Sequence, residues 1–282
     1  MKLVDTKDLK SLPFGSASSS LAEGTKKTMI KFHFTFDKTQ KSQSLKKKLL
    51  KKYKNISPKI ADVIIVGGGD GYMLNSLKKY IKFKKPFYGI NCGTFGFLMN
   101  NFVFKNLEKK VANAKLSIIN PLQIINYNNN KKKNIIAIND ISLFRQTKQT
   151  VSLKINVENK TIIKKLIGDG VIISTPAGST AYNLSVGGPI LSLNSGKLTV
   201  TPISPFRPRR WKGKIISNKS KVKIINLDSK KRPIALVADN IEVRDIKTLT
   251  LKSDNNISLS LLHDKNKTLE KRIKIEQNKK PR

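Results

Sequence analysis

The feature that most constrains the fold is a short apolar run that ends in a glycine-rich turn, ADVIIVGGGDG at residues 61–71. Its apolar half, Ala61 to Val66, is rich in β-branched residues and is typical of a strand buried in an α/β sheet. Glycines at a strand end let the backbone approach a ligand closely, and the amides that open the next helix suit phosphate. Asp70 adds a negative charge that a phosphate-binding loop does not need, so the pattern favours catalysis. The alternative is a turn in which Asp70 caps the helix.

The first part of the chain alternates expected strands and helices. Apolar and polar residues alternate from 29 to 36, as in a half-buried strand, and Leu45, Leu49 and Tyr53 recur at helical spacing. We expect strands at 29–36, 61–66 and 86–90, and helices at 45–53, 72–82 and 107–114. A second glycine turn, at 91–98, follows the third strand. This order is an α/β layer pattern, in which ligands bind at the strand ends.

From about residue 117 the pattern changes to short strands joined by turn signals, which favours antiparallel hairpins. The expected strands are 122–127, 134–145, 151–157, 161–167, 214–217, 221–226, 233–238, 241–251 and 257–262. Residues 266–277 form a final charged helix. Many short strands of this kind are typical of a sandwich.

These patterns predict the fold class, which is an α/β N-terminal domain followed by an all-β domain of sandwich type. We expect a flexible leader at 1–28, the α/β domain at 29–115 and the β-rich domain at 116–265. The C-terminal helix and tail, 266–282, are expected to pack back on the α/β domain.

The charge of +38 is spread along the whole chain, mostly as lysine, with many Asn and Ile residues. Because no basic patch with interleaved aromatics appears, we expect no specific nucleic-acid partner, although a diffuse positive field attracts anionic small molecules. Cys92 is the single cysteine, which excludes an internal disulfide and favours a reducing compartment. No apolar run approaches the roughly 18 residues of a spanning helix, and the start lacks a signal-peptide core. We therefore expect a cytoplasmic protein without a membrane partner.

A second cluster of small and polar residues lies at 168–190, where a buried strand runs into a turn with small hydroxyl residues and Tyr182. Small side chains leave room for a flat ring, and hydroxyls and amides can bond its edge. The cluster favours a nucleotide site, and a purely structural turn is the alternative.

Four segments together resemble the NAD kinase family, in its order and at its spacing. They are GGDG at 68–71, NCGTFGFL at 91–98, ND at 139–140 and GDGVIISTPAGSTAYNLSVGGPI at 168–190. The segment TPISPFRPRRW at 201–211 also looks like one that bacterial members carry. The resemblance implies a Rossmann-like, phosphofructokinase-like N-terminal domain. It also implies ATP-dependent phosphorylation of the adenosine-ribose 2′-hydroxyl of NAD, which gives NADP.

The resemblance also assigns roles to single residues. Asp70 matches the family's proton acceptor, and Gly71 matches the adjoining nucleotide contact. Asn139 and Asp140 match a pair that contacts NAD, where many members have Asn-Glu. Further positions match those around the bound dinucleotide: Asp169, Thr180, Ala181, Tyr182, Asn183, Leu184 and Ser185. The family's Asp-x-Gln corresponds only loosely to residues 239–241, so no glutamine role is carried across.

The resemblance further implies NAD and ATP as bound partners, Mg²⁺ or another divalent metal ion arriving with ATP, and a homo-oligomer. No sequence-local cluster of metal ligands appears, so no residue is assigned to a metal. Two other function classes stay open. A different GGDG-type kinase that acts on a lipid or sugar is disfavoured by the block at 168–190. A basic nucleic-acid-binding protein on a decayed kinase fold is disfavoured by the intact Asp70 and its glycines.

Overall fold

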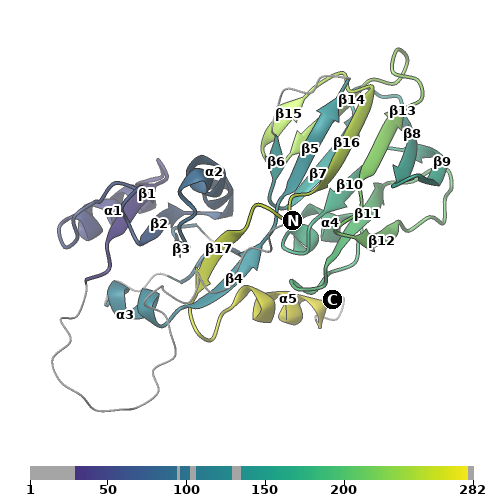
Figure 1. The fold of residues 1–282 in the computed structure, drawn as a ribbon. Coiled ribbons are helices and arrows are strands. Elements are labelled where there is room, and N and C mark those ends of the chain that lie inside the picture. The colour runs from purple at the N-terminus through teal and green to yellow at the C-terminus, as the bar shows by residue number, and fades with distance from the viewer. Residues whose placement is uncertain (1–28, 94–95, 102–105, 129–134, 279–282) are drawn as a thin grey trace. The chain divides into compact units, whose positions relative to one another are not determined.

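The structure is a computed structural model that describes residues 29–93, 96–101, 106–128 and 135–278. The predicted leader, 1–28, lies outside the described residues. Internal contacts divide the chain into two units. The first holds residues 1–76, 85–117 and 261–268, and the second holds 77–84, 118–260 and 269–282. Figure 1 draws both units, which are described one at a time below.

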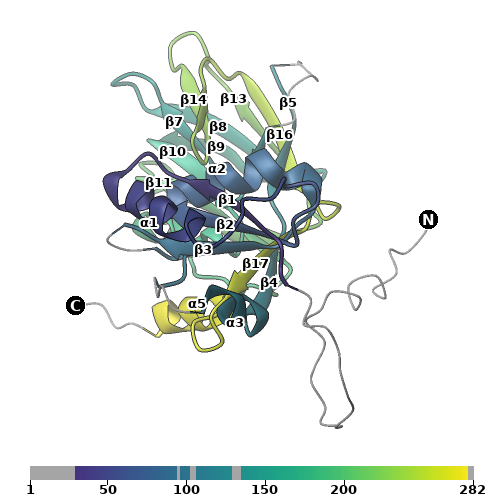
Figure 2. The same ribbon diagram turned by 90° about the vertical axis from the view of Figure 1, so that its left-hand side faces the viewer.

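The first unit is built on a five-stranded sheet with the order β1-β2-β3-β17-β4 (Figure 2). The pairs β1–β2, β2–β3 and β3–β17 are parallel. The strands are β1 (Phe32–Phe36), β2 (Val63–Gly68), β3 (Phe87–Asn91), β4 (Lys115–Ile119) and β17 (Leu259–His263). Its helices are α1 (Gln40–Leu50), α2 (Asp70–Tyr80) and α3 (Leu107–Ala112). The last turn of α2 and the 3₁₀ turn η2 (Ile81–Phe83) group with the second unit. Alternating strands and helices thus give the predicted α/β class.

The core of this unit explains why these segments become strands and helices. All six residues of β2 are buried, as its unbroken apolar run predicts. Helix α1 buries Leu45 and Leu49 and leaves its lysines in solvent. A side chain at Gly67 would meet the Phe36 ring at 2.5 Å. Close packing on the sheet therefore requires glycine at this position.

The second unit is a sandwich of two six-stranded sheets, with the orders β12-β11-β10-β7-β14-β15 and β6-β5-β16-β13-β8-β9. Its strands are β5 (Leu122–Tyr127), β6 (Ile136–Ala137), β7 (Asp140–Arg145), β8 (Val151–Val157), β9 (Lys160–Gly168), β10 (Gly170–Ser174), β11 (Lys197–Ile203), β12 (Lys214–Ser217), β13 (Val222–Asn226), β14 (Ile234–Ala238), β15 (Ile241–Val243) and β16 (Thr248–Ser253). Its helices are the 3₁₀ turn η3 (Gly178–Thr180), α4 (Tyr182–Ser185) and α5 (Leu269–Gln277). Both sheets contribute to one hydrophobic core, as in the predicted sandwich class.

Strand β7 shows how this core positions polar residues. Side chains alternate between the two faces of a strand. Ile141 and Leu143 point into the core, so Asp140, Ser142 and Phe144 lie on the opposite face. On that outer face, Tyr182 of the predicted site stacks on Phe144.

Two expectations about connectivity need correction. The run at 257–262 was expected in the β-rich domain, but β17 pairs in parallel with β3 in the first sheet. The final helix was expected on the α/β domain, but α5 groups with the second unit, where Gln277 donates to the carbonyl of Ile190. Hydrophobic periodicity predicts that a strand or helix forms, whereas its partner is decided by tertiary pairing.

Candidate functional site

The GGDG turn joins β2 to α2 and is open on one side. Gly68 ends β2, and the amide of Met73 donates to the carbonyl of Gly69 at 3.0 Å, which is the first hydrogen bond of the helix. A side chain placed at Gly69 or Gly71 would meet no atom of the described residues within 4 Å. Among these residues, no neighbour demands glycine at either position, and the backbone on either side of Asp70 is uncovered.

The carboxylate of Asp70 is held by the turn that follows β3. Its Oδ2 accepts a hydrogen bond from the amide of Phe97 at 2.6 Å, and its Oδ1 accepts one from Leu98 at 2.9 Å. A carboxylate has about four acceptor positions. These two bonds fix the orientation of its carboxylate.

The two glycine turns of the first unit meet because their strands are neighbours. Gly68 lies opposite Asn91 in the parallel pairing of β2 and β3. The amide of Cys92 donates to the carbonyl of Gly68 at 2.8 Å. The predicted turn at 91–98 thus begins beside the GGDG turn, although its residues 94–95 lie outside the described residues.

In the second unit, the Asn139–Asp140 turn packs against the segment that follows β10. The carbonyl of Asn139 accepts a bond from the amide of Thr175 at 2.9 Å, and the Thr175 hydroxyl donates to the carbonyl of Ile138 at 2.8 Å. A side chain at Gly178 would lie 2.1 Å from the Asn139 carbonyl oxygen. The fold therefore joins two segments that are about 35 residues apart in sequence.

Asp140 is a buried carboxyl group, with 8% of its surface exposed. Burial, together with the nearby charge of Asp239, raises its pKa to about 7. A carboxyl group with such a pKa exchanges its proton near neutral pH, so it can act as a donor or an acceptor toward a ligand.

Asp239 is a residue of this site that the sequence did not reveal. Its carboxylate accepts bonds from the amides of Ile138 at 2.8 Å and Asn139 at 2.9 Å. Lys78 forms an ion pair with it at 2.9 Å. The one available signal was its position at the start of the loose Asp-x-Gln match, directly after the strand expected at 233–238.

Tyr182 is an exposed aromatic side chain close to two carboxylates. It is 40% exposed and stacks on Phe144, with ring centroids 5.7 Å apart and planes 28° apart. Partial burial raises its pKa, and the charges of Asp140 and Asp169 raise it further. Asp169 itself pairs with Arg145 at 2.6 Å and stays partly exposed. Aromatic and charged groups therefore gather on the outer face of this sheet.

Asn183 differs from its predicted neighbours, because its side chain is completely buried. Its Nδ2 donates to the carbonyls of Ser179 and Pro189, and its Oδ1 accepts from the hydroxyls of Thr199 and Thr201. All its hydrogen-bonding positions are used within the protein. Its side chain therefore holds the turn rather than facing a ligand. The other predicted residues of this turn are half-buried or exposed, namely Thr180, Ala181, Leu184 and Ser185.

Comparison with known proteins identifies the family to which this chain belongs. Family models for the ATP-NAD kinase N-terminal and C-terminal domains match residues 15–114 and 138–252. The NAD kinase of Brucella melitensis is 41% identical over 253 residues, which cover 89% of this chain and 98% of the relative. The chain belongs to the NAD kinase family. The resemblance expected from its motifs is confirmed.

Further NAD kinases agree with this membership. The NAD kinase of Caulobacter vibrioides is 40% identical over 237 residues, covering 84% of this chain and 91% of the relative. A crystal structure of yeast NADH kinase complexed with NADH aligns with a TM-score of 0.66 at 25% identity, over 79% of this chain and 68% of that one. An Archaeoglobus fulgidus NAD kinase in complex with ATP shares the fold, with a TM-score of 0.68 at 21% identity over 86% of this chain and 98% of that one.

Within the described ranges, no group of three or more His, Cys, Asp or Glu side chains could hold a metal ion. No helix in the part of the chain that the structure describes is long and apolar enough to span a membrane.

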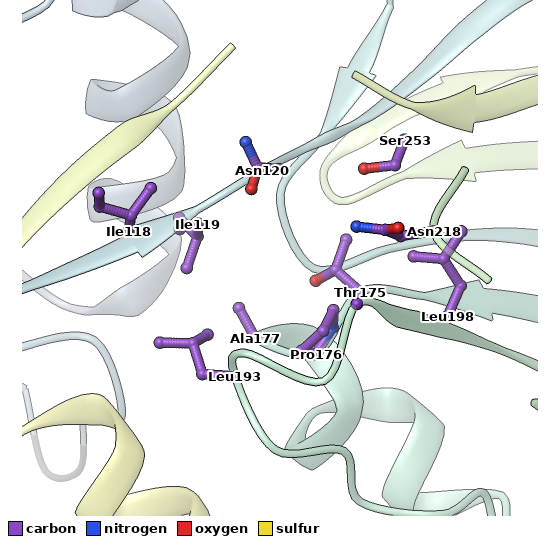
Figure 3. A pocket seen from close by; sticks show the side chains of 11 residues that line it. Ile118, Ile119, Asn120, Thr175, Pro176, Ala177, Leu193, Leu198, Asn218 and Ser253 are labelled. Carbon is purple, nitrogen blue, oxygen red and sulfur yellow. The ribbon is translucent and has the colours of Figure 1, made fainter. Parts of the chain in front are cut away.

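A small pocket lies in the second unit, beside the Thr175–Ala177 segment (Figure 3). Its walls mix apolar side chains such as Leu193 and Leu198 with the polar side chains of Asn120 and Asn218. Its volume is about 40 Å³, which is room for a few water molecules at most. The pocket is too small for a dinucleotide, and neither Asn139 nor Asp140 lines it.

Proposed function

We propose that this chain transfers the γ-phosphoryl group of ATP to the 2′-hydroxyl of the adenosine ribose of NAD, giving NADP, with Asp70 as the proton acceptor. Membership of the NAD kinase family supports the reaction. One geometric observation supports the role of Asp70, namely that two backbone amides fix its carboxylate between glycines that face open space.

The proposed step needs a base and little other covalent help from the protein. A ribose hydroxyl is a poor nucleophile until its proton leaves. The 2′-oxygen forms a bond to the γ-phosphorus, the bond from that phosphorus to the β–γ bridging oxygen breaks, and the hydroxyl proton passes to a carboxylate oxygen of Asp70. Phosphoryl transfer otherwise depends on positioning and on charge neutralisation.

The second unit would supply the NAD contacts. Tyr182 offers an exposed ring for stacking, and Asn139, Asp140 and Asp169 offer polar groups for hydroxyls and amides. Gly71 gives a nucleotide close access to the start of α2. Yeast NADH kinase was solved with NADH and the Archaeoglobus fulgidus NAD kinase with ATP, so both nucleotides are ligands to test here.

We also assign Mg²⁺, or another divalent ion, to the triphosphate, because Mg²⁺ is usually held by substrate phosphates with few protein ligands. We infer a homo-oligomer that works in the cytoplasm, where its single free cysteine stays reduced. Light scattering during gel filtration measures the oligomeric state directly.

The purified chain should convert NAD to NADP when it is incubated with ATP and Mg²⁺, and an NADP-specific dehydrogenase detects the product. EDTA should abolish the reaction. A chain that leaves NAD unchanged but phosphorylates a diacylglycerol or a sugar would contradict the proposal. Substituting NADH for NAD, and polyphosphate for ATP, then defines which acceptor and which donor it accepts.

A further inference from the structure

The backbone around the Asn139–Asp140 turn is fixed by one side chain from another part of the second unit. The carboxylate of Asp239 lies 2.8 Å from the amide of Ile138, 2.9 Å from that of Asn139 and 3.4 Å from that of Asp140. In return, the amide of Asp239 donates to the carbonyl of Asp140 at 3.2 Å. The two segments therefore hold each other through side chain and backbone at once.

Asp239 occupies a constrained position. Its φ is +52°, in the left-handed region, which Asp and Asn tolerate better than other non-glycine residues. Its side chain is 1% exposed, and a buried charge needs a partner. Lys78 supplies one, because its Nζ lies 2.9 Å from Oδ2 of Asp239 and also donates to the carbonyl of Ala238 at 3.2 Å.

A buried ion pair between a carboxylate and an ammonium group often stabilises a fold less than well-packed apolar side chains do. Amides bonded to a charged acceptor, however, are held more tightly than amides bonded to a neutral one. Here the three successive backbone amides of residues 138–140 all donate to the carboxylate of Asp239. As a result, residues 139 and 140 are presented in one fixed orientation.

We propose that Asp239 is a positioning residue for NAD, acting through the Asn139–Asp140 turn, with Lys78 as its counterion. This inference rests on the proposed function, in which Asn139 and Asp140 contact NAD. Asp239 itself touches no substrate in this assignment. Its loss therefore weakens NAD binding more than it slows the chemical step.

The substitution Asp239→Asn tests this directly, because Asn suits the left-handed backbone as well as Asp does. The amide side chain keeps one accepting oxygen and loses the charge. We expect the KM for NAD to rise by roughly tenfold, as the loss of a charged hydrogen bond implies, with a smaller change in the KM for ATP and in kcat. Asp254→Asn is the matched control, since Asp254 is also a buried carboxylate that accepts a backbone amide in the same unit.

A pH profile separates positioning from general loss of structure. The charge of Asp239 is one of the two causes that raise the pKa of Asp140, burial being the larger. Lys78 neutralises Asp239, and Tyr182 is the other titratable group that interacts with Asp140. The midpoint of the pH dependence of NAD affinity should therefore move to lower pH in Asp239→Asn. It should move to higher pH in Lys78→Gln, which leaves Asp239 charged without its cation.

The measurements are the NAD dissociation constant by calorimetry between pH 5 and 9, the two KM values, and the melting temperature. Opposite midpoint shifts in the two variants, with a selective rise in the KM for NAD, support the proposal. Equal rises in both KM values with an unmoved midpoint overturn it, as does an unchanged KM for NAD. If Asp239→Asn does not fold, Lys78→Gln still gives the midpoint. Formation of NADP by the unsubstituted chain tests the proposed function separately.

Discussion

The Oδ2 atom of Asp70 lies 2.6 Å from the amide nitrogen of Phe97, so the predicted proton acceptor also anchors the turn that follows β3. Together with the bond to Leu98, this contact ties the first residue of α2 to a segment 27 positions further along the chain. A substitution at Asp70 therefore changes structure as well as chemistry, and a test of its role has to measure both.

The substitution Asp70→Asn should lower kcat by about 10²–10⁴-fold, the typical contribution of a general base. It should also lower the free energy of unfolding by about 1–2 kcal/mol, because the new NH₂ group cannot accept the bond from one of the two amides. Steady-state kinetics and urea unfolding measure the two effects. Turnover close to that of the unsubstituted chain would show that Asp70 is only a turn residue.

Asp62→Asn is the matched control for this experiment. Asp62 also accepts a backbone hydrogen bond, from the amide of Lys31 at 2.8 Å, in the same unit. It should lose a little stability and keep its turnover. A comparable drop in kcat in Asp62→Asn would show that the lower kcat of Asp70→Asn comes from a weakened backbone hydrogen bond and not from the loss of a base.

Gly71→Ala should make the protein more stable and less active. Its added methyl group meets no atom within 4 Å in the part of the chain that the structure describes. Alanine in a helix is favoured over glycine by roughly 0.5–1 kcal/mol. A bound nucleotide would meet that methyl group, and overpacking costs on the order of 1–3 kcal/mol, so kcat/KM should fall by about tenfold or more. Thermal unfolding and kinetics check this pair of outcomes. Unchanged kinetics would remove Gly71 from the nucleotide site.

Gly178→Ala, unlike Gly71→Ala, should lower stability, because its methyl group would overlap the carbonyl oxygen of Asn139. Either the turn moves or the unit loses stability, by about 1–3 kcal/mol as for other overpacked positions. We expect a lower melting temperature together with weaker NAD binding. A variant as stable as the unsubstituted chain would contradict the close packing of these two segments.

Tyr182→Ala should raise the KM for NAD more than the KM for ATP. The side chain is 40% exposed, so its removal should cost little stability. An aromatic stacking contact contributes about 0.5–1.5 kcal/mol, which corresponds to roughly a 2- to 12-fold change in KM. Tyr182→Phe keeps the ring beside Phe144 and should retain most of the affinity. Equal changes in both KM values with a lowered melting temperature would favour a structural tyrosine.

The raised pKa of Asp140 predicts how stability depends on pH. An aspartate of the unfolded chain titrates near pH 3.9, whereas Asp140 in the folded chain has a pKa of about 7. Between these values the folded state keeps a proton that the unfolded state has lost, so the free energy of unfolding falls as the pH rises. The contribution is complete below about pH 4 and is lost above pH 7, with a size of at most about 4 kcal/mol.

The substitution Asp140→Asn removes this titration. The difference in unfolding free energy between the unsubstituted chain and the variant should therefore decline from pH 4.5 to pH 8 in urea unfolding experiments. A difference that stays constant over this range would show that the pKa of Asp140 is not raised.

Much of the fold follows from local pattern, as two strands illustrate. The expected strands at 122–127 and 151–157 coincide with β5 and β8, because alternation of apolar and polar residues is a local property. Strand β11 was not expected. It contains Pro202, which lacks an amide hydrogen and usually argues against an interior strand, yet it pairs with both β10 and β12. The run at 241–251 is divided between β15 and β16, with Asp245 in the left-handed region between them.

Candidate site residues could be proposed from the sequence where motifs are contiguous, but not where contacts are remote. Asp70, Asn139 and Tyr182 lie in segments whose residue types point to ligand chemistry. Asp239 has its effect through bonds to residues about 100 positions away, which no local pattern reports. The burial of Asn183 could not be predicted from the sequence either, because only the fold brings its four hydrogen-bond partners together.

The buried amide of Asn183 accordingly predicts a loss of stability rather than of ligand affinity. Asn183→Leu has a similar size but would leave Thr199 and Thr201 without their shared acceptor in the interior. Each unsatisfied buried group costs about 1–3 kcal/mol. The melting temperature should fall sharply. A stable variant with weaker NAD binding would instead place this side chain in contact with the ligand.

The place of β17 has a consequence for how the protein is made. The strand that lies next to β3 is encoded almost 170 residues after it, so a growing chain reaches residue 263 before the first sheet can be completed. Until then the edge of β3 has no neighbour on that side, and synthesis at roughly 5–20 residues per second makes this an interval of many seconds. Unpaired edges of this kind promote aggregation. A gene shortened before residue 259 would therefore yield a chain whose first sheet lacks β17 beside β3, however intact its motifs are.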